Sequence, residues 1–216
     1  MSDGPEIGRL VIVGAGGQGR ETLDIVEALD RTDRHWDIIG FVSSGGEDPA
    51  PLRRRGVPVL GDLSTLEGLD VSVVVAIGSG DARRRVTGQI GPRDYPVLAH
   101  PASRCGDAEI GEGAVLAAGS AVADGTTLGR HIQLNLNARV GSGCLLGDFT
   151  TVSPGCRIDD EVELGEGVFL GAGCRVRVGP VGQGAVIGAG ASVERPVGPG
   201  ETVVGRPAGR TCAAQE

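Results

Sequence analysis

Apolar residues in the second half of the chain recur at every sixth position. Branched aliphatic residues occupy twelve successive positions of this period, from Ile110 to Val176. A small residue usually follows each of them, and another small or β-branched residue stands four positions later. An α-helix would place apolar residues every three or four positions, and a half-buried strand would alternate them every two. A period of six instead predicts short strands joined by tight corners and wound into a parallel β-helix.

Three six-residue units make one triangular coil, so successive coils stack at the strand spacing of about 4.8 Å. The aliphatic residues then fill the interior, and the small residues beside them turn each corner without a Cβ clash. The register slips once, because Val176 is followed by Val181, Ile187 and Val193. The pattern predicts about five coils. It also accounts for the scarcity of aromatic residues, which a narrow interior does not accommodate.

The first hundred residues follow a different pattern. Apolar runs at 10–13, 37–42 and 71–77 predict buried strands, and an amphipathic segment at about 20–29 predicts a helix. Strands that alternate with helices are typical of a small α/β domain with a parallel sheet. The expected fold class is therefore α/β plus β-helix, with a Rossmann-like domain in front of the prism.

The first of these strands ends in a glycine-rich turn that includes Gly14, Gly16 and Gly17 and leads into the helix. The order of strand, Gly-x-Gly-x-x-Gly and helix brings the backbone close to a phosphate at a helix N-terminus. A dinucleotide site also needs an acidic residue about twenty positions further on, and Ser43 and Ser44 stand there instead. The absence of this acidic residue therefore argues against a redox cofactor. It leaves open a nucleotide-like acceptor, a sugar-like acceptor or no ligand.

Charge and composition narrow the classes of partner. A net charge of −8 argues against nucleic acid, whose phosphates need a basic face. No apolar run approaches the length of a membrane helix, and the start MSDGPEIGRL lacks the regions of a secretory signal. Three of the five cysteines occupy small inward positions of the repeat, where core packing is the simplest role. We therefore expect a cytoplasmic protein that binds no metal and no membrane.

Short motifs are spread over nearly the whole chain. They are VIVGAGGQG at 11–19, IGF at 39–41, AIG at 76–78, His100-Pro101, Leu134-Asn135, GDF at 147–149, Pro154-Gly155, IGAGA at 187–191 and VGRPA at 204–208. In this order they resemble the NeuD/PglD-like sugar O- and N-acyltransferases, a family of hexapeptide-repeat enzymes. The resemblance implies a left-handed β-helix, a homotrimer, acetyl-CoA or another acyl-CoA as donor, and acceptor sites between neighbouring prisms.

At the expected catalytic position the chain departs from this family. Where the family has a histidine base followed by an acidic helper, this chain has Ser142 and Gly143. A second family histidine, near the CoA thioester, corresponds to Thr151. The acidic pair that helps to hold the nucleotide sugar corresponds to Ser43 and Ser44. A neutral serine does not act as a base near pH 7 without an activating partner.

Few residues are available to replace the missing base. His131 is the best histidine available, although a solvated corner residue is the simpler interpretation. Asp148 lies on the six-residue unit after Ser142, and its carboxylate is a weak base, although corner acids in such prisms are usually only solvated. Asn135 matches a family position near the acceptor and is expected to orient a substrate by hydrogen bonds.

The late coils carry the residues expected to bind the donor. By match to the family, Thr151, Ala172 and Ala189 lie nearest the pantetheine arm. Arg206 and neighbouring arginines are expected to bind the CoA phosphates by charge-assisted hydrogen bonds. Ordinary surface charge is the alternative for these arginines.

Together these observations predict a CoA-dependent acyltransferase that acts on an amine or hydroxyl of a sugar-like or specialised-metabolite acceptor. We expect an acceptor-binding domain over residues 1–104 and an acyltransferase domain over 105–216. Loss of a general base costs about 10²–10⁴-fold, whereas orientation alone supplies on the order of 7–11 kcal/mol. A base-less enzyme would therefore be slow but active. The alternative is a catalytically silent binding or scaffold protein that kept the trimeric fold.

Overall fold

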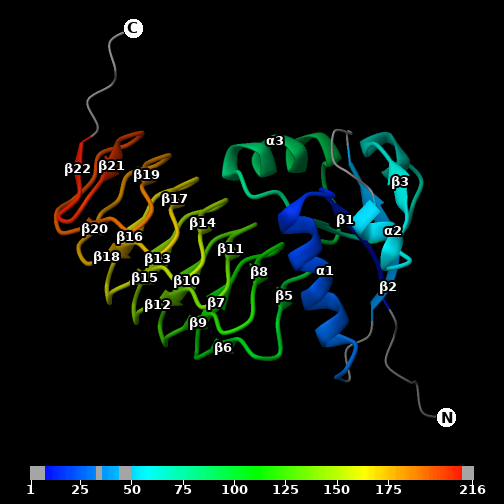
Figure 1. Ribbon diagram of the computed structural model, residues 1–216, viewed down its shortest axis with the longest axis horizontal. Coiled ribbons are helices and arrows are strands. Elements are labelled where there is room, and N and C mark those ends of the chain that lie inside the picture. Colours follow the sequence, from blue (N-terminus) through cyan, green and yellow to red (C-terminus); the bar gives the residue numbers. More distant parts are fainter. Residues whose placement is uncertain (1–7, 33–35, 44–49, 211–216) are drawn as a thin grey trace, which may run out of the picture.

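The computed structural model describes residues 8–32, 36–43 and 50–210, and Figure 1 shows them as two adjoining parts. A small sheet with helices around it forms the N-terminal part, and a stack of short strands forms the rest. Ser44, one of the expected acceptor-binding residues, lies outside the described residues.

The N-terminal sheet has four parallel strands in the order β3-β2-β1-β4. These strands are β1 (Gly8–Val13), β2 (Trp36–Val42), β3 (Val59–Gly61) and β4 (Ser72–Val75). Strand β1 is apolar on both sides, because Leu10 and Ile12 pack into one core cluster while Val11 and Val13 pack into another. The predicted α/β domain with a parallel sheet is confirmed.

Three helical segments connect these strands in the described part of the chain, and a fourth, α3, leads from β4 to the prism. They are α1 (Gly17–Leu29), α2 (Ala50–Arg54), the 3₁₀-helix η1 (Leu63–Leu66) and α3 (Gly80–Ile90). Helix α1 begins earlier than the sequence pattern indicates, because the glycine-rich turn itself forms the first helical turn. Helix α3 is capped by the Ser79 hydroxyl, which accepts a hydrogen bond from the backbone of Ala82, and ends at Gly91 with a φ of 76°.

The remaining strands stack into the three sides of a prism. The first side contains β5 (Leu98–Ala99), β8 (Val115–Leu116), β11 (Gln133–Leu134), β14 (Thr151–Val152), β17 (Phe169–Leu170), β19 (Val186–Ile187), β21 (Thr202–Val204) and the antiparallel β22 (Gly209–Arg210). The second side contains β6 (Arg104–Cys105), β9 (Ala121–Val122), β12 (Arg139–Val140), β15 (Arg157–Ile158), β18 (Arg175–Val176) and β20 (Ser192–Val193). The third side contains β7 (Glu109–Ile110), β10 (Thr127–Leu128), β13 (Leu145–Leu146) and β16 (Glu163–Leu164).

The aliphatic residues that define the period of six fill the interior of this prism. Val181, the first residue after the predicted slip in register, is 1% exposed and bridges Leu164 on one side and Val197 on the other. The inward cysteines are also buried, as core packing requires, and they are Cys144, Cys156 and Cys174. The β-helix predicted from the period is therefore confirmed, including the place where the period breaks.

Close stacking of the coils explains why glycine is frequent at the corners. A Cβ atom added to Gly147 would lie 2.5 Å from the backbone nitrogen of Glu166 in the next coil. One added to Gly171 would lie 2.5 Å from the backbone nitrogen of Ala189. Neither position accepts a side chain without separating the coils.

Helix α3 joins the two parts through one buried arginine, and Figure 1 shows it lying over the first side of the prism. Arg83 is fully buried, and its guanidinium donates to the carbonyl oxygens of His131 (3.0 Å) and Phe149 (2.8 Å). It also donates to Oε1 of Gln133 (3.2 Å) and to Oγ1 of Thr151 (3.0 Å). Burial lowers the pKa of Arg83 to about 9, so the group remains a cation at neutral pH. This part of the junction is therefore polar and specific, while Leu98, Val115 and Ala117 of the prism share an apolar cluster with the N-terminal part.

Candidate functional site

The glycine-rich turn lies at the carboxyl end of β1, where the strand order reverses between β1 and β4. Gly14 has a φ of 109°, donates its N–H to the carbonyl oxygen of Val42 at 2.8 Å, and would bring a Cβ to 2.7 Å from the carbonyl oxygen of Ala76. The fold itself therefore requires this glycine. A Cβ added to Gly16 or Gly17 meets no described atom within 4 Å, so the first turn of α1 is open on its outer side.

Ser43 follows the neighbouring strand β2 and donates its backbone N–H to the carbonyl oxygen of Gly61 at 2.8 Å. Because β1 and β2 are paired in parallel, Gly14 and Ser43 come to the same edge of the sheet. In open α/β sheets, ligands bind at such carboxyl edges where the strand order reverses. Asn135, the remaining acceptor-binding candidate, is buried on the β-helix instead.

The corners of the prism form three edges, each named after the side that precedes it. Among their corner residues, the first edge carries Asn135, Ala172 and Ala189, the second carries Asp124, Ser142 and Asp160, and the third carries His131, Asp148 and Phe149. Ser142 thus lies on a different edge from His131 and Asp148. Within one chain, these three catalytic candidates do not form one constellation.

His131, on the third edge, lies within the junction between the two parts of the molecule. Its ring stacks on Phe149 with the ring centroids 5.3 Å apart and meets the edge of Tyr95 at 4.8 Å. Only 3% of the residue is exposed, so it is not the solvated corner residue of the simpler interpretation. Burial, together with the charges of Arg83 and Arg130, lowers the pKa of His131 to about 4. The ring is therefore neutral near pH 7, and its environment opposes its protonation.

Asp148, the next residue on the third edge, is held by Arg130 of the coil above. One carboxylate oxygen accepts the backbone N–H of Arg130 at 2.8 Å, and the other accepts its guanidinium at 2.7 Å and 2.9 Å. Both oxygens thus already serve an ion pair. This arrangement stabilises the stacking of two corners and leaves neither oxygen free for catalysis.

Ser142 is exposed on the second edge, and the carboxylate of Asp160 lies beside it. Oδ1 of Asp160 accepts the backbone N–H of Ser142 at 2.9 Å. The sequence interpretation missed Asp160, because it searched for a replacement base close to Ser142 along the chain. The coil length was the available signal, since a residue three six-residue units further on stacks directly under Ser142.

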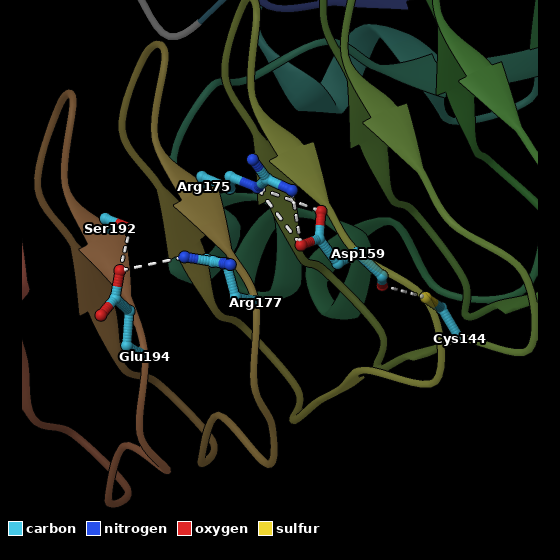
Figure 2. Close-up of polar contacts among 6 residues, drawn as sticks. All are labelled: Cys144, Asp159, Arg175, Arg177, Ser192 and Glu194. Carbon is cyan, nitrogen blue, oxygen red and sulfur yellow. Dashed lines mark hydrogen bonds and ion pairs between the residues drawn. The ribbon is translucent and has the colours of Figure 1, made fainter.

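Four arginine side chains gather around a hollow between the first edge and the second side, and we call it the arginine hollow. Its lining residues are Gly155, Arg157, Gly173, Cys174, Arg175, Arg177, Ala191, Ser192 and Arg206. Figure 2 shows two of these arginines against acidic partners. Arg175 pairs with Asp159 at 2.8 Å, and Arg177 pairs with Glu194 at 3.3 Å.

Three of the four donor-binding candidates meet beside the arginine hollow. Ala172 and Ala189 are exposed and stack on the first edge, where the N–H of Gly190 donates to the carbonyl oxygen of Ala172 at 2.8 Å. Arg206 donates its Nε hydrogen to the carbonyl oxygen of Gly190. Thr151 lies elsewhere, because its hydroxyl is buried in the domain junction and hydrogen-bonds to the carbonyl oxygen of Gly78 at 3.0 Å.

A second hollow on the second side reaches the second edge, and we call it the second-edge hollow. It is lined in part by Arg139, Arg157, Arg175, Asp159 and Asp160, so it shares Arg157 and Arg175 with the arginine hollow. Arg139, Arg157 and Arg175 stand opposite one another in the strand ladder. In the described part of the chain, Arg139 and Arg157 have no ion-pair partner. The two hollows together form one continuous, partly cationic surface.

Neither a metal-binding cluster nor a membrane-spanning helix is found among the described residues. No group of three or more histidine, cysteine, aspartate or glutamate side chains there is arranged to hold a metal ion. No described helix is long and apolar enough to cross a membrane.

Comparisons with known proteins agree with this architecture. Residues 9–90 match the model of the PglD N-terminal domain. The chain is 30% identical to the acetyltransferase domain of PglB from Neisseria gonorrhoeae in complex with acetyl coenzyme A, and the match has a TM-score of 0.83 and covers 95% of this chain and 100% of that one. It is 27% identical to a variant of perosamine N-acetyltransferase from Caulobacter crescentus in complex with CoA and GDP-perosamine, with a TM-score of 0.84 and coverage of 96% and 98%. No curated protein matches the chain at significant sequence similarity.

The fold and these matches define the class as a hexapeptide-repeat acyltransferase, built as a left-handed β-helix behind a Rossmann-like domain. Within that class, the chain belongs to the PglD/NeuD-like family of sugar acetyltransferases. The family resemblance and the fold class predicted from the sequence are both confirmed.

Proposed function

We propose that this protein transfers an acyl group, with acetyl as the first to test, from acyl-CoA to an amine or hydroxyl of a sugar-like or specialised-metabolite acceptor. The arginine hollow carries this proposal, because four arginines converge there in a chain whose net charge is −8. CoA bears a pyrophosphate and a 3′-phosphate, which guanidinium groups bind through charge-assisted hydrogen bonds. The relatives solved with acetyl-CoA and with CoA support the same donor.

The donor would lie along the first edge. Arg206 and the other arginines of the hollow would hold its phosphates, and the pantetheine arm would pass Ala172 and Ala189, whose small exposed side chains leave room for it. The Thr151 hydroxyl is already hydrogen-bonded within the domain junction, so we propose no donor contact for this residue.

The acceptor would be held by the N-terminal domain. The open first turn of α1 at Gly16 and Gly17 offers backbone N–H groups to an anionic or polar ligand, and Gly14 and Ser43 border it at the same sheet edge. The GDP-perosamine bound to the Caulobacter relative supports a sugar nucleotide as one acceptor to test. The proposal keeps the expectations of a homotrimer and of a cytoplasmic location. A trimer would bring edges of neighbouring prisms together.

The reacting groups would meet at Ser142, the position of the family base. Serine there leaves space and no strong base, so orientation of a neutral nucleophile against the thioester must supply much of the catalysis. Asn135 and His131 would contribute by shaping the surrounding structure, since both side chains are buried.

The donor site is tested by replacing Ala189 with tryptophan. In the wild-type chain, CoA at a hundred times its Kd should stabilise the fold by about 2.7 kcal/mol, which raises Tm by about 5–10 °C. The bulky indole should fill the pantetheine path, so the Ala189→Trp variant should lose this shift. The measurement is thermal unfolding with and without CoA, and Leu136→Trp, on the same edge three coils earlier, serves as the matched control.

Catalysis is then separated from binding by measuring release of the free thiol of CoA with a panel of amine and hydroxyl acceptors. Turnover supports the enzyme. A chain that binds CoA, loses the shift in Ala189→Trp and still releases no thiol with any acceptor would instead be the silent binding protein of the alternative interpretation. An equal Tm shift in Ala189→Trp and wild type would place the donor elsewhere.

A further inference from the structure

The second edge repeats one structural motif, in which an aspartate accepts the backbone N–H of the corner above it. Oδ1 of Asp124 accepts the N–H of Asp107 at 2.9 Å, and Oδ1 of Asp160 accepts the N–H of Ser142 at 2.9 Å. A hydrogen bond of this kind fixes the corner and also fixes the direction of the carboxylate. The Asp160 carboxylate is therefore held between the coil that contains Ser142 and the next coil, which contains Asp160 itself.

The remaining oxygen distinguishes Asp160 from the two nearby acids Asp148 and Asp159, and its place beside Ser142 distinguishes it from Asp124. In Asp148 the second oxygen is taken by the guanidinium of Arg130, and Asp159 is taken by Arg175. The second oxygen of Asp160 has no hydrogen-bond or ion-pair partner in the part of the chain that the structure describes. Asp160 thus presents one oriented, exposed carboxylate oxygen beside Ser142.

The surroundings of this oxygen fit a reacting centre. Asp160 lines the second-edge hollow, and that hollow shares Arg157 and Arg175 with the arginine hollow proposed for the donor. A donor anchored by its phosphates in the arginine hollow and the reacting group of an acceptor that enters the second-edge hollow would meet on a continuous surface. The free oxygen of Asp160 lies on that surface, on the edge where the family base is expected.

We propose that Asp160 is the general base of this acyltransferase and that the acceptor is an amine; this inference rests on the acyltransferase function proposed above. The amine nitrogen attacks the thioester carbonyl carbon, and Asp160 accepts the proton that the nitrogen loses as the new C–N bond forms. The C–S bond then breaks. The departing thiolate of CoA takes the proton from the Asp160 carboxyl group, which restores the carboxylate.

The chemistry of a carboxylate base decides between the two classes of acceptor. Aspartate side chains are in general weaker bases than histidine, with reference pKa values of about 3.9 and 6.5. An amine nitrogen becomes strongly acidic once it has bonded to the carbonyl carbon, so a weak base is sufficient to remove its proton. A hydroxyl group attacks well only when its proton is removed during the attack, which requires a stronger base. A base that is Asp160, one coil after Ser142, in place of the family histidine therefore favours N-acylation.

The test compares Asp160→Asn with Asp124→Asn, a control that carries the same backbone hydrogen bond one coil above Ser142. Asparagine keeps the oxygen that accepts the Ser142 N–H, so both variants should fold. With an amine acceptor and acetyl-CoA, kcat of Asp160→Asn should fall about 10²–10⁴-fold while the Kd for CoA stays unchanged. Asp124→Asn should retain the wild-type rate, and Asp160→Glu should recover part of it.

Different results overturn different claims. Wild-type turnover that persists undiminished in Asp160→Asn would refute the role of Asp160 and leave the acyltransferase function intact. Equal wild-type rates with an amine and with the alcohol of otherwise identical structure would refute the amine assignment. An equal loss of kcat in Asp124→Asn would show that the carboxylates act through the corner structure. Turnover with alcohols but with no amine would refute the amine assignment alone. Absence of wild-type turnover with every amine and every alcohol, despite CoA binding, would overturn both proposals.

Discussion

At the scale of single residues, one strongly perturbed titrating group is not used by the proposed chemistry. His131 is enclosed by Phe149 and Tyr95, and two arginines oppose its protonation. The neutral imidazole ring of His131 packs there as a planar, partly apolar group at the junction of the two parts. Its left-handed φ of 53° is one that histidine and asparagine adopt more readily than most residues.

The buried histidine predicts a loss of stability in mild acid. The pKa of His131 is lowered from 6.5 to about 4, so the unfolded chain binds a proton between these pH values and the folded chain does not. Stability is therefore complete above pH 6.5 and falls as the pH drops towards 4. Between pH 7 and pH 5 the loss from this group is about 2 kcal/mol. Urea unfolding at the two pH values measures it.

The variant His131→Asn, which tolerates the same backbone conformation, is the comparison for this prediction. It should be less stable than the wild type at pH 7, because the ring contacts are gone, but the drop between pH 7 and pH 5 should shrink. The same drop in both proteins would assign the acid sensitivity to other groups.

The sequence was sufficient to direct attention to Ser142 but not to its neighbour Asp160. Ser142 is found by matching motifs along the chain. Asp160 is found only by counting one coil further and knowing that the carboxylate points back towards the preceding coil. Similarly, nothing in the sequence around Asp148 indicates that Arg130 occupies both of its oxygens.

At the scale of elements, helix α3 is the part that fixes the N-terminal domain on the prism. Its sequence contains three consecutive arginines, and packing against the prism buries only one of them. Arg83 is fully buried among carbonyl oxygens, Arg84 pairs with Glu166 at 2.8 Å, and Arg85 is exposed. The Ser79 cap begins the helix, but which arginine is buried depends on the prism beside it.

Replacing Arg83 with methionine should separate the two parts. The carbonyl oxygens of residues such as Phe149 and His131 would lose their donor while staying buried, and each unsatisfied group costs about 1–3 kcal/mol. We expect a loss of at least about 3 kcal/mol, measured by chemical denaturation, together with faster proteolysis near α3. Arg85→Met, two residues along the same helix, should change stability little. If Arg83→Met were as stable as Arg85→Met, the junction would have to depend on other contacts.

At the scale of the whole molecule, the period of six determines the prism and the glycine-rich strand-helix motif determines the domain before it. Both follow from local spacing, which is why both could be predicted. Which residues share an edge of the prism could not be predicted in the same way. Ser142 and His131 are only eleven positions apart in the sequence but lie on different edges. The proposed trimer would bring edges of neighbouring chains together, so its assembly is a separate prediction to test.

The third side of the prism offers the surface on which such an assembly can be tested. Leu145 is 49% exposed there, between Thr127 and Glu163 in the strand ladder, and it lines a hollow with buried aliphatic residues beneath it. An exposed leucine over an apolar hollow is the kind of feature that a second copy of the chain covers. We expect the wild-type protein to sediment at about 66 kDa, three times the 21.9 kDa chain, at micromolar concentration.

Leu145→Glu should shift that equilibrium towards the single chain, because the carboxylate would have to be buried against a neighbour without a partner. Val59→Glu, at a similarly exposed apolar residue on the edge strand of the N-terminal domain, should leave the mass unchanged. If donor and acceptor meet between prisms, the dissociated Leu145→Glu chain should also lose acyl transfer while it keeps its fold, as circular dichroism would show. A wild-type monomer at micromolar concentration would refute the predicted trimer. Full activity in a monomeric Leu145→Glu variant would show that a single prism is sufficient for acyl transfer.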